Sequence, residues 1–123
     1  DSNSKLIDRI KSIIIDEIHH KSTSDKINFS KILSEELNKD YSSSSKLFSA
    51  VEGQTIEQFV LNQKIEKVKE LLFYNEYSLS EIAHQLNYSS TTHLSAQFKK
   101  ITGMSPTAFK KLKSNIRKPL DSI

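Results

Sequence analysis

The side chains of this chain best suited to chemistry are hydroxyl and basic groups gathered in two short runs. One run reads SSSSK, from Ser42 to Lys46, and the other reads SSTTHLSAQFKK, from Ser89 to Lys100. Hydroxyl, imidazole and ammonium groups donate hydrogen bonds to phosphate oxygens and to the base edges exposed in DNA grooves. The same groups also suit a solvated helix surface, so the elements that carry them must decide between the two interpretations.

Enzyme chemistry finds no support in the sequence. The chain has no Cys, which excludes disulfides and thiolate nucleophiles and fits a reducing compartment. His19 and His20 are adjacent, so a helix would point them in different directions and prevent them from sharing a metal ion. His84 has no plausible Ser or Cys nucleophile, and no Gly-rich phosphate loop or catalytic-triad spacing is present. We predict that the protein is not an enzyme and needs no cofactor or metal.

The two runs lie at equivalent places in an internal repeat. The pair Leu37-Asn38 matches Leu86-Asn87 at an offset of 49, and three later pairs match at an offset of 50: Phe48 with Phe98, Gly53 with Gly103, and Phe59 with Phe109. A repeat held over several elements is harder to obtain by chance than any single motif. The second copy therefore has one extra residue in the turn before its second helix.

Apolar residues recur at helical spacing along nearly the whole chain, which predicts an all-α fold. Leu6, Ile10, Ile14 and Ile18 place a first amphipathic helix at about residues 5–20, followed by a polar loop at 21–26. An isolated apolar stripe must be buried, so we expect this helix to dock on the first repeat, although dimerisation or connection to another domain stays open. Further helices are expected at about 29–38, 41–51, 56–73, 79–87, 90–101 and 106–115.

Capping residues punctuate these helices. Ser78 with Glu81, and Thr55 with Gln58, have the spacing of capping boxes. The two glycines, Gly53 and Gly103, each follow a pair of apolar helix residues, where a left-handed residue commonly ends a helix. Pro is expected at the first position of a helix, where its missing N–H costs nothing. The remaining expected N-terminal signals are Asn28 before the second helix, Ser2 or Ser4 before the first, and Ser105-Pro106 before the last.

The distribution of charge is uneven although the net charge is only +3 over 123 residues. No acidic residue lies between Glu81 and Asp121, and this stretch holds Lys99, Lys100, Lys110, Lys111, Lys113, Arg117 and Lys118. Such a basic stretch is where phosphate neutralisation would be wanted. No membrane span or signal peptide is predicted, and we expect a cytoplasmic protein. The first residue is not Met, so we expect a fragment of a longer protein.

The residues from Asn28 to Lys113 resemble the AraC/XylS family of bacterial transcription regulators. The most specific part is SEIAHQLNYSSTTHLSAQFKKITGMSPTAFKK, and KIEKVKELL at residues 64–72 resembles the linker helix of the family. The resemblance implies two helix-turn-helix subdomains joined by a long helix, which bind adjacent major-groove segments on one face of DNA. We expect an N-terminal helix and loop at 1–27, subdomains at 28–60 and 77–115, a linker helix at 56–74 and a basic tail at 116–123.

The resemblance also indicates which residues would contact DNA. The groove-facing positions of the first motif map to Ser42, Ser45 and Lys46. Those of the second map to Thr91, Thr92, Ser95 and Ala96, and we add Ser90, His93, Lys99 and Lys100 as contacts. Many relatives have an apolar residue where Ser44 stands, and the first run has no Arg for a bidentate contact to guanine. We therefore expect phosphate contacts and DNA shape to carry much of the affinity.

The sequence thus predicts the DNA-binding domain of a bacterial transcription regulator. The alternative is a helical protein-interaction module that keeps the fold with little DNA reading, and the serine-rich first run keeps this alternative open. The expected partners are double-stranded DNA, an upstream sensory domain and, as a further candidate, RNA polymerase, with no membrane. Operator, effector, regulated genes and the sign of regulation stay open.

Overall fold

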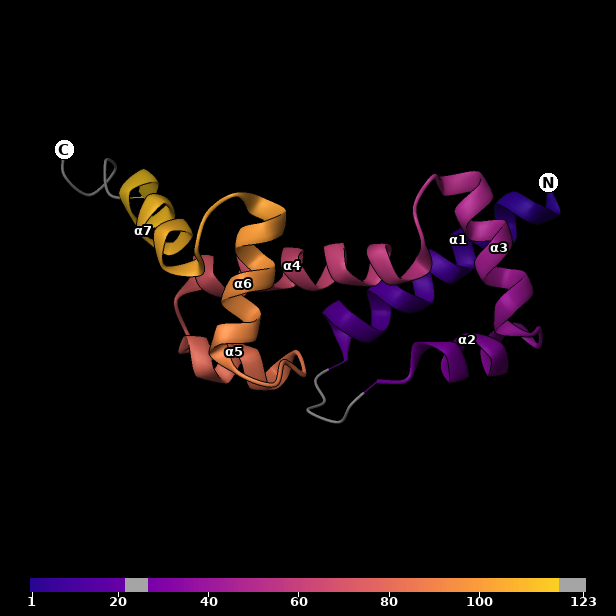
Figure 1. Cartoon of the computed structure of the whole chain (residues 1–123), viewed down its shortest axis with the longest axis horizontal. Helices are drawn as coiled ribbons and strands as arrows, with labels where there is room; N and C mark the ends of the chain where they lie inside the picture. Colours follow the sequence, from indigo (N-terminus) through magenta and orange to yellow (C-terminus); the bar gives the residue numbers. More distant parts are fainter. Residues whose placement is uncertain (22–26, 118–123) are drawn as a thin grey trace. The chain divides into compact units, whose positions relative to one another are not determined.

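Every secondary-structure element in the described part of the chain, residues 1–21 and 27–117, is a helix in the computed structural model (Figure 1). The prediction of an all-α fold is therefore confirmed. The helices are α1 (Ser2–Ile15), a π-helical turn η1 (Asp16–His20), α2 (Phe29–Leu37), α3 (Tyr41–Glu52), α4 (Ile56–Tyr74), α5 (Leu79–Gln85), α6 (Thr91–Thr102) and α7 (Pro106–Arg117). The loop expected at 21–26 and the basic tail lie almost wholly outside the described residues.

The chain divides into two compact units, unit 1 (Asp1–Gln63) and unit 2 (Lys64–Ile123). The division falls within α4, so the first part of that helix belongs to unit 1 and the rest to unit 2. None of the helices in the described residues is both long enough and apolar enough to cross a membrane.

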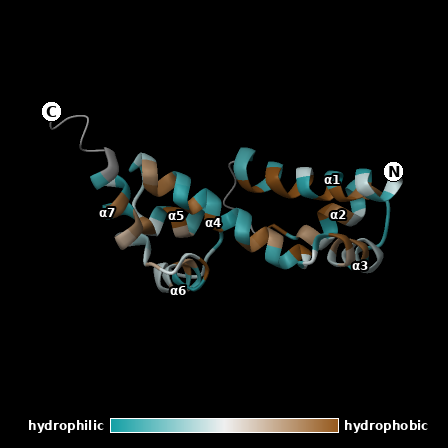
Figure 2. Ribbon diagram, turned by 90° about the horizontal axis from the view of Figure 1, so that it is seen from above, coloured by the Kyte–Doolittle hydropathy of each residue, from teal (hydrophilic) through white to brown (hydrophobic). Residues whose placement is uncertain are grey.

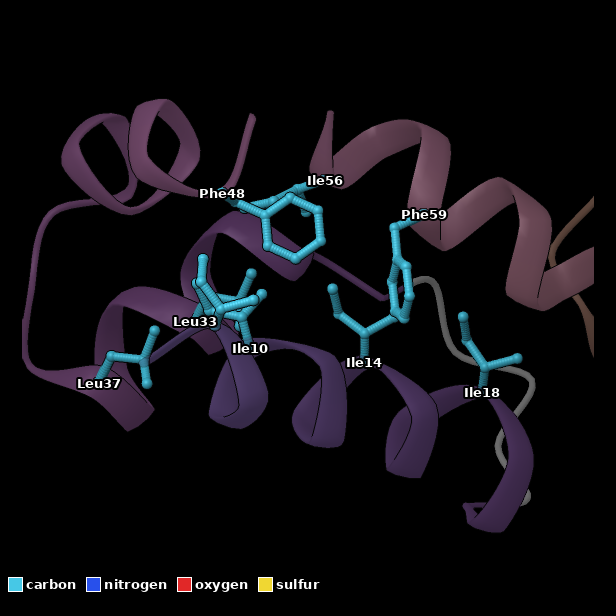
Figure 3. Close-up of a cluster of buried hydrophobic side chains, with 9 residues drawn as sticks. Ile10, Ile14, Ile18, Leu33, Leu37, Phe48, Ile56 and Phe59 are labelled. Atoms are coloured by element: carbon cyan, nitrogen blue, oxygen red, sulfur yellow. The ribbon is translucent and has the colours of Figure 1, made fainter. Parts of the chain in front are cut away.

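Unit 1 is built around an isoleucine stripe on α1. Hydrophobic and hydrophilic residues alternate along this helix in Figure 2, as expected of a helix with one buried face. Figure 3 shows the stripe pointing toward apolar side chains of α2, α3 and the start of α4. The docking of the N-terminal helix on the first repeat is therefore confirmed. The core consists of Ile7, Ile10, Ile14, Ile18, Leu33, Leu37, Phe48, Ile56 and Phe59.

Two polar contacts add to this docking. Lys11 of α1 forms an ion pair with Glu52 at the end of α3. The guanidinium of Arg9 donates to the backbone carbonyl of Glu36 at 3.2 Å. Fully burying one aliphatic side chain stabilises a fold by about 1.5–3 kcal/mol, whereas an exposed ion pair contributes about 1 kcal/mol or less. The isoleucine stripe is therefore the main attachment of α1.

Unit 2 uses the second part of α4 as unit 1 uses α1. Ile65, Val68 and Leu72 are buried and share the spacing of Ile7, Ile10 and Ile14. The N-terminal helix is thus the counterpart, in unit 1, of the end of the linker helix. The other buried residues of unit 2 are Ile82, Ala83, Leu86, Tyr88, Leu94, Phe98, Pro106 and Phe109.

The expected caps are present at most helix ends. The Asn28 side chain accepts from the Lys31 amide, and Ser78 and Glu81 form a reciprocal capping box. Thr55 and Gln58 exchange two side-chain-to-backbone hydrogen bonds of 3.0 Å. Ser105 Oγ accepts from the Ala108 amide at 3.1 Å, and Gly53 and Gly103 adopt the predicted left-handed conformation, with φ of 71° and 86°.

Two expectations at helix ends were wrong. The cap of α1 is Asp1, whose carboxylate accepts from the Ser4 amide at 2.8 Å, and neither Ser2 nor Ser4. A carboxylate satisfies the free amides as a hydroxyl does and also interacts favourably with the positive end of the helix dipole. The helix expected at 79–87 ends at Gln85, because Asn87 adopts a left-handed conformation with φ of 62° that stops the helix.

Candidate nucleic-acid interface

The first candidate surface lies on the solvent side of α3. Asp40 caps this helix by accepting from the Ser43 amide at 3.1 Å, and Ser44 and Phe48 are its buried residues. The predicted contact residues lie on the remaining face, at i, i+3 and i+4 spacing: Ser42 and Lys46 are exposed, and Ser45 is half-buried. The structure therefore brings the three predicted residues together on one helix face.

Two aspects of this surface limit its positive character. The backbone and side chain of Ser43 donate to Asp40 and, with a smaller contribution from nearby Lys46, hold the pKa of that carboxyl below its usual range. The ionised Asp40 thus lies near the only lysine of α3. The Tyr41 hydroxyl donates a hydrogen bond to Glu57 at the start of α4. Burial is the main cause that raises the pKa of the Tyr41 phenol, and the hydrogen bond to Glu57 is the second.

Ser44 is an unusual core residue. Its side chain is 2% exposed, and among the described residues its Oγ and the Tyr88 hydroxyl are the buried side-chain oxygens that lack a hydrogen-bond partner. A buried polar group without a partner costs about 1–3 kcal/mol. The position where the resemblance implies an apolar residue is thus occupied by a buried hydroxyl, which we expect to lower the stability of unit 1.

The second candidate surface lies on α6. Ser90 caps the helix and accepts from the His93 amide at 3.0 Å, while Leu94 and Phe98 are fully buried. The other predicted residues lie on the outer side: Thr92, His93, Ala96, Lys99 and Lys100 are exposed, and Thr91 and Ser95 are half-buried. The Ser90 hydroxyl is engaged in the cap, so its availability for a ligand is lower than that of Thr92.

The extra residue in the turn before α6 leads to a cluster of side chains around His93. Tyr88 is 8% exposed, and its ring meets the His93 ring edge to face at 5.1 Å between centroids. Ser89 Oγ lies 3.2 Å from His93 Nδ1, and the Lys64 ammonium lies 5.1 Å from the Tyr88 ring centroid. Tyr88 thus fills the small core under the turn. Its contact with His93 and the role of Ser89 were missed, although the extra residue pointed to this turn.

The two units carry opposite net charges. Residues 1–63 contain eight Lys or Arg and ten Asp or Glu, a formal charge of −2. Residues 64–123 contain ten Lys or Arg and five Asp or Glu, a formal charge of +5. The basic groups on or next to the outer face of α6 can therefore neutralise phosphate, whereas the α3 surface offers hydroxyls and one lysine.

Comparison with known proteins places the chain among helix-turn-helix domains. Residues 33–112 match the family model of a helix-turn-helix domain. The chain is 27% identical over 107 residues to the probable transcriptional regulator LumQ of Photobacterium leiognathi, covering 87% of this chain and 43% of that protein. It therefore spans less than half the length of that relative.

Solved structures show the same fold. The C-terminal domain of AraT, a response regulator from Geobacillus stearothermophilus, aligns with a TM-score of 0.72 at 26% identity, over 87% of this chain and 84% of that domain. The DNA-binding domain of the transcription factor AdpA, solved with a target DNA, aligns with a TM-score of 0.73 at 18% identity, over 92% and 96% of the two chains.

Proposed function

Because the chain belongs to the AraC/XylS family, as an AraC-type helix-turn-helix domain of transcription regulators, we propose that α3 and α6 are its two recognition helices. Each would enter a major-groove segment, and the two segments would be adjacent on one face of the duplex. The repeated geometry of the two units carries this proposal. In both, a capped helix buries two residues four apart, ends at a left-handed Gly and leaves a polar outer face.

Unit 2 would supply most of the electrostatic affinity. Lys99 and Lys100 are exposed in the last turn of α6, where their ammonium groups can neutralise phosphates and release counterions. Thr92 and Ser95 would offer hydroxyls to base edges, and Ala96 would offer a methyl group to a thymine methyl. Ser95 and Ala96 lie one turn after Thr92, and Lys99 and Lys100 lie about two turns after it. A single groove could therefore reach all five residues.

Unit 1 would contribute fewer contacts. Lys46 can donate to a guanine, and Ser42 and Ser45 can donate to or accept from a base. Without an arginine on α3, the bidentate guanine contact is missing. Phosphate contacts and the shape of the DNA would therefore provide much of the recognition by this unit.

We also propose that the chain binds DNA without a small-molecule effector. A cavity of about 150 Å³ in unit 2 is lined by Leu72, Leu79, Pro106, Thr107 and Lys110. Sites for drug-sized ligands usually measure roughly 300–1,000 Å³, so this cavity is too small for a typical effector. Sensing would lie in a separate domain of a longer protein, and RNA polymerase would be a further partner. The test is to measure the affinity of this chain for DNA with and without cell metabolites and to compare it with the affinity of the longer protein. A chain that responds to metabolites as the longer protein does would contradict the proposal.

A salt titration tests DNA binding itself. If about six phosphates are neutralised, log affinity for a random duplex should fall against log salt with a slope of about −5. A slope near zero would exclude the electrostatic contact proposed for unit 2.

Footprinting tests the use of both helices. Two recognition helices in successive major-groove segments should give hydroxyl-radical protections about 10 bp apart on one face of the duplex. One protected patch would mean that a single unit engages DNA, which would favour a protein-binding role for the other.

A further inference from the structure

His93 on α6 is an exposed side chain whose ring is held from two directions. The Ser89 hydroxyl lies 3.2 Å from Nδ1, and the Tyr88 ring stands nearly perpendicular to the imidazole, at 79°. Its backbone amide is fixed by Ser90 Oγ at 3.0 Å. Most exposed side chains exchange freely between rotamers, whereas this one has both its main chain and its ring engaged.

The support under the imidazole is itself part of the core. Tyr88 is buried, its amide donates to the Ala83 carbonyl at 2.9 Å, and the Lys64 ammonium lies over its ring. Unit 1 has no counterpart, because its shorter turn lacks this residue. Ser43 takes the place of His93 there, and its hydroxyl donates to Asp40 at 2.9 Å.

The contact with Ser89 determines which ring nitrogen can meet a ligand. Nδ1 is engaged inside the protein, so Nε2 is the nitrogen left for an outside partner. His93 lies one turn before Ala96 and Gln97 and two turns before Lys100, beside the surface proposed to face DNA. A protonated imidazole donates from both nitrogens and makes a charge-assisted hydrogen bond to a phosphate oxygen, which is stronger than the neutral one.

We propose that Tyr88 and Ser89 are positioning residues that hold His93 as a protonatable phosphate contact, so that DNA binding strengthens as the pH falls through the range of histidine. The proposal rests on the DNA-binding role of α6 proposed above. The titratable group in contact with the imidazole ring is Tyr88, and the Lys64 ammonium, on α4, lies over the Tyr88 ring. A DNA phosphate would supply the negative charge that favours the protonated imidazole, so binding would take up a proton.

The chain suits a test of this coupling, because it contains four histidines and no Cys. Histidine is the side chain that ordinarily titrates between pH 5 and 8. Affinity of the whole chain for a random duplex would be measured at pH 6, 7 and 8 at constant ionic strength. We expect a several-fold gain on acidification, with a ceiling of about tenfold per pH unit for one proton. His93→Gln should remove most of the pH dependence.

Matched variants separate this effect from a general one. His84→Gln on α5 and His20→Gln on η1 also replace exposed histidines and should keep the wild-type pH profile. Ser89→Ala should flatten the profile, whereas Tyr88→Phe keeps the ring that supports the imidazole and should preserve it. An unchanged profile in His93→Gln, with DNA binding intact, would overturn this inference alone. Absence of DNA binding by the wild type at every pH would overturn the proposed function together with it.

Discussion

Unit 1 and unit 2 share a framework but differ in what packs under the proposed recognition helix, α3 or α6. Phe48 meets Phe59 at 5.7 Å and 70°, and Phe98 meets Phe109 at 5.5 Å and 72°, so the aromatic pair is kept in both copies. One turn earlier, α6 buries Leu94 whereas α3 buries Ser44. The two units therefore share the aromatic pair and differ at the neighbouring buried position, where the Ser44 hydroxyl has no partner among the described residues.

The units differ in charge as well as in packing. With formal charges of −2 and +5, only unit 2 attracts the phosphate backbone from a distance. Unit 1 is expected to engage after unit 2 is in place and to add discrimination more than affinity. Substitutions at equivalent positions can test how far this asymmetry reaches.

The largest expected contrast is in stability, at the buried position of each recognition helix. Leu94→Ala should destabilise the protein by about 3 kcal/mol, because it removes apolar contacts and leaves a cavity. Ser44→Ala should stabilise it by about 1 kcal/mol, because it removes a hydroxyl buried without a partner among the described residues. Chemical denaturation would measure both changes, and hydrogen exchange would assign each to its unit.

Ser42→Ala is the matched control for the second substitution. It gives the same gain in helix propensity at an exposed position of α3, so the excess in Ser44→Ala reports the buried hydroxyl. Equal effects of the two substitutions would show that the Ser44 hydroxyl costs nothing.

The next contrast is in DNA affinity and its salt dependence. Replacing Lys99 and Lys100 with Gln should make the slope of log affinity against log salt shallower by about 2, since each phosphate contact contributes about 0.9. The same change at Lys31 and Lys39, exposed lysines of unit 1, should have a smaller effect. Filter binding at several salt concentrations would measure both slopes. Equal losses in the two variants would show that the excess of charge in unit 2 does not determine affinity.

Most of the helices could be predicted from the sequence, because the apolar spacing within a helix and the caps at its ends depend on residues close together in the chain. Caps such as Ser78 with Glu81 connect residues three apart, so they can be recognised without tertiary information. The cap of α1 was missed because four polar residues, Asp1 to Ser4, compete at its start, and the carboxylate of Asp1 is favoured by the helix dipole. The π-helical turn at Asp16–His20 has no comparable local signal.

The candidate surfaces were less accessible from the sequence than the fold. The residues on α3 and α6 followed from the resemblance, but their partners depend on how an element packs. The Tyr88–His93 contact required knowing that the inserted turn residue points inward. That Ser44 Oγ lacks a hydrogen-bond partner could not be predicted, because this depends on every polar group packed around it in the tertiary structure.

A smaller contrast concerns direct reading of bases. Replacing Thr92 and Ser95 together with Ala should weaken binding more than replacing Ser42 and Ser45 together, because we expect the basic unit 2 to be held more closely to DNA. Lys46→Ala alone should cost about 1 kcal/mol if it makes one good base contact. Competition titrations with a selected binding site would rank the variants. The reverse order of the two double substitutions would make unit 1 the main reader of sequence.

The smallest effect at neutral pH is expected at Tyr88, where the hydroxyl has no partner among the described residues. Burial raises the pKa of Tyr88 to about 12, from 10.0 in a model peptide. Between these values the unfolded chain loses the phenolic proton while the folded chain keeps it. The contribution of Tyr88 is therefore fully present below pH 10 and is lost as the pH rises toward 12. Tyr88→Phe should stabilise the protein at pH 7, as Ser44→Ala should, but by less than about 1 kcal/mol because Tyr88 is 8% exposed and Ser44 is 2% exposed. It should also reduce the loss of stability between pH 10 and 12. Tyr41→Phe differs, because it also removes a hydrogen bond to Glu57 and should be destabilising at pH 7.

Thermal unfolding from pH 7 to 11.5 would compare Tyr88→Phe with Tyr41→Phe, with Tyr74→Phe at an exposed position as the control. An alkaline profile of Tyr88→Phe that matches the wild type would mean that the phenol reaches solvent, and the support proposed for His93 would then be looser than its contacts indicate.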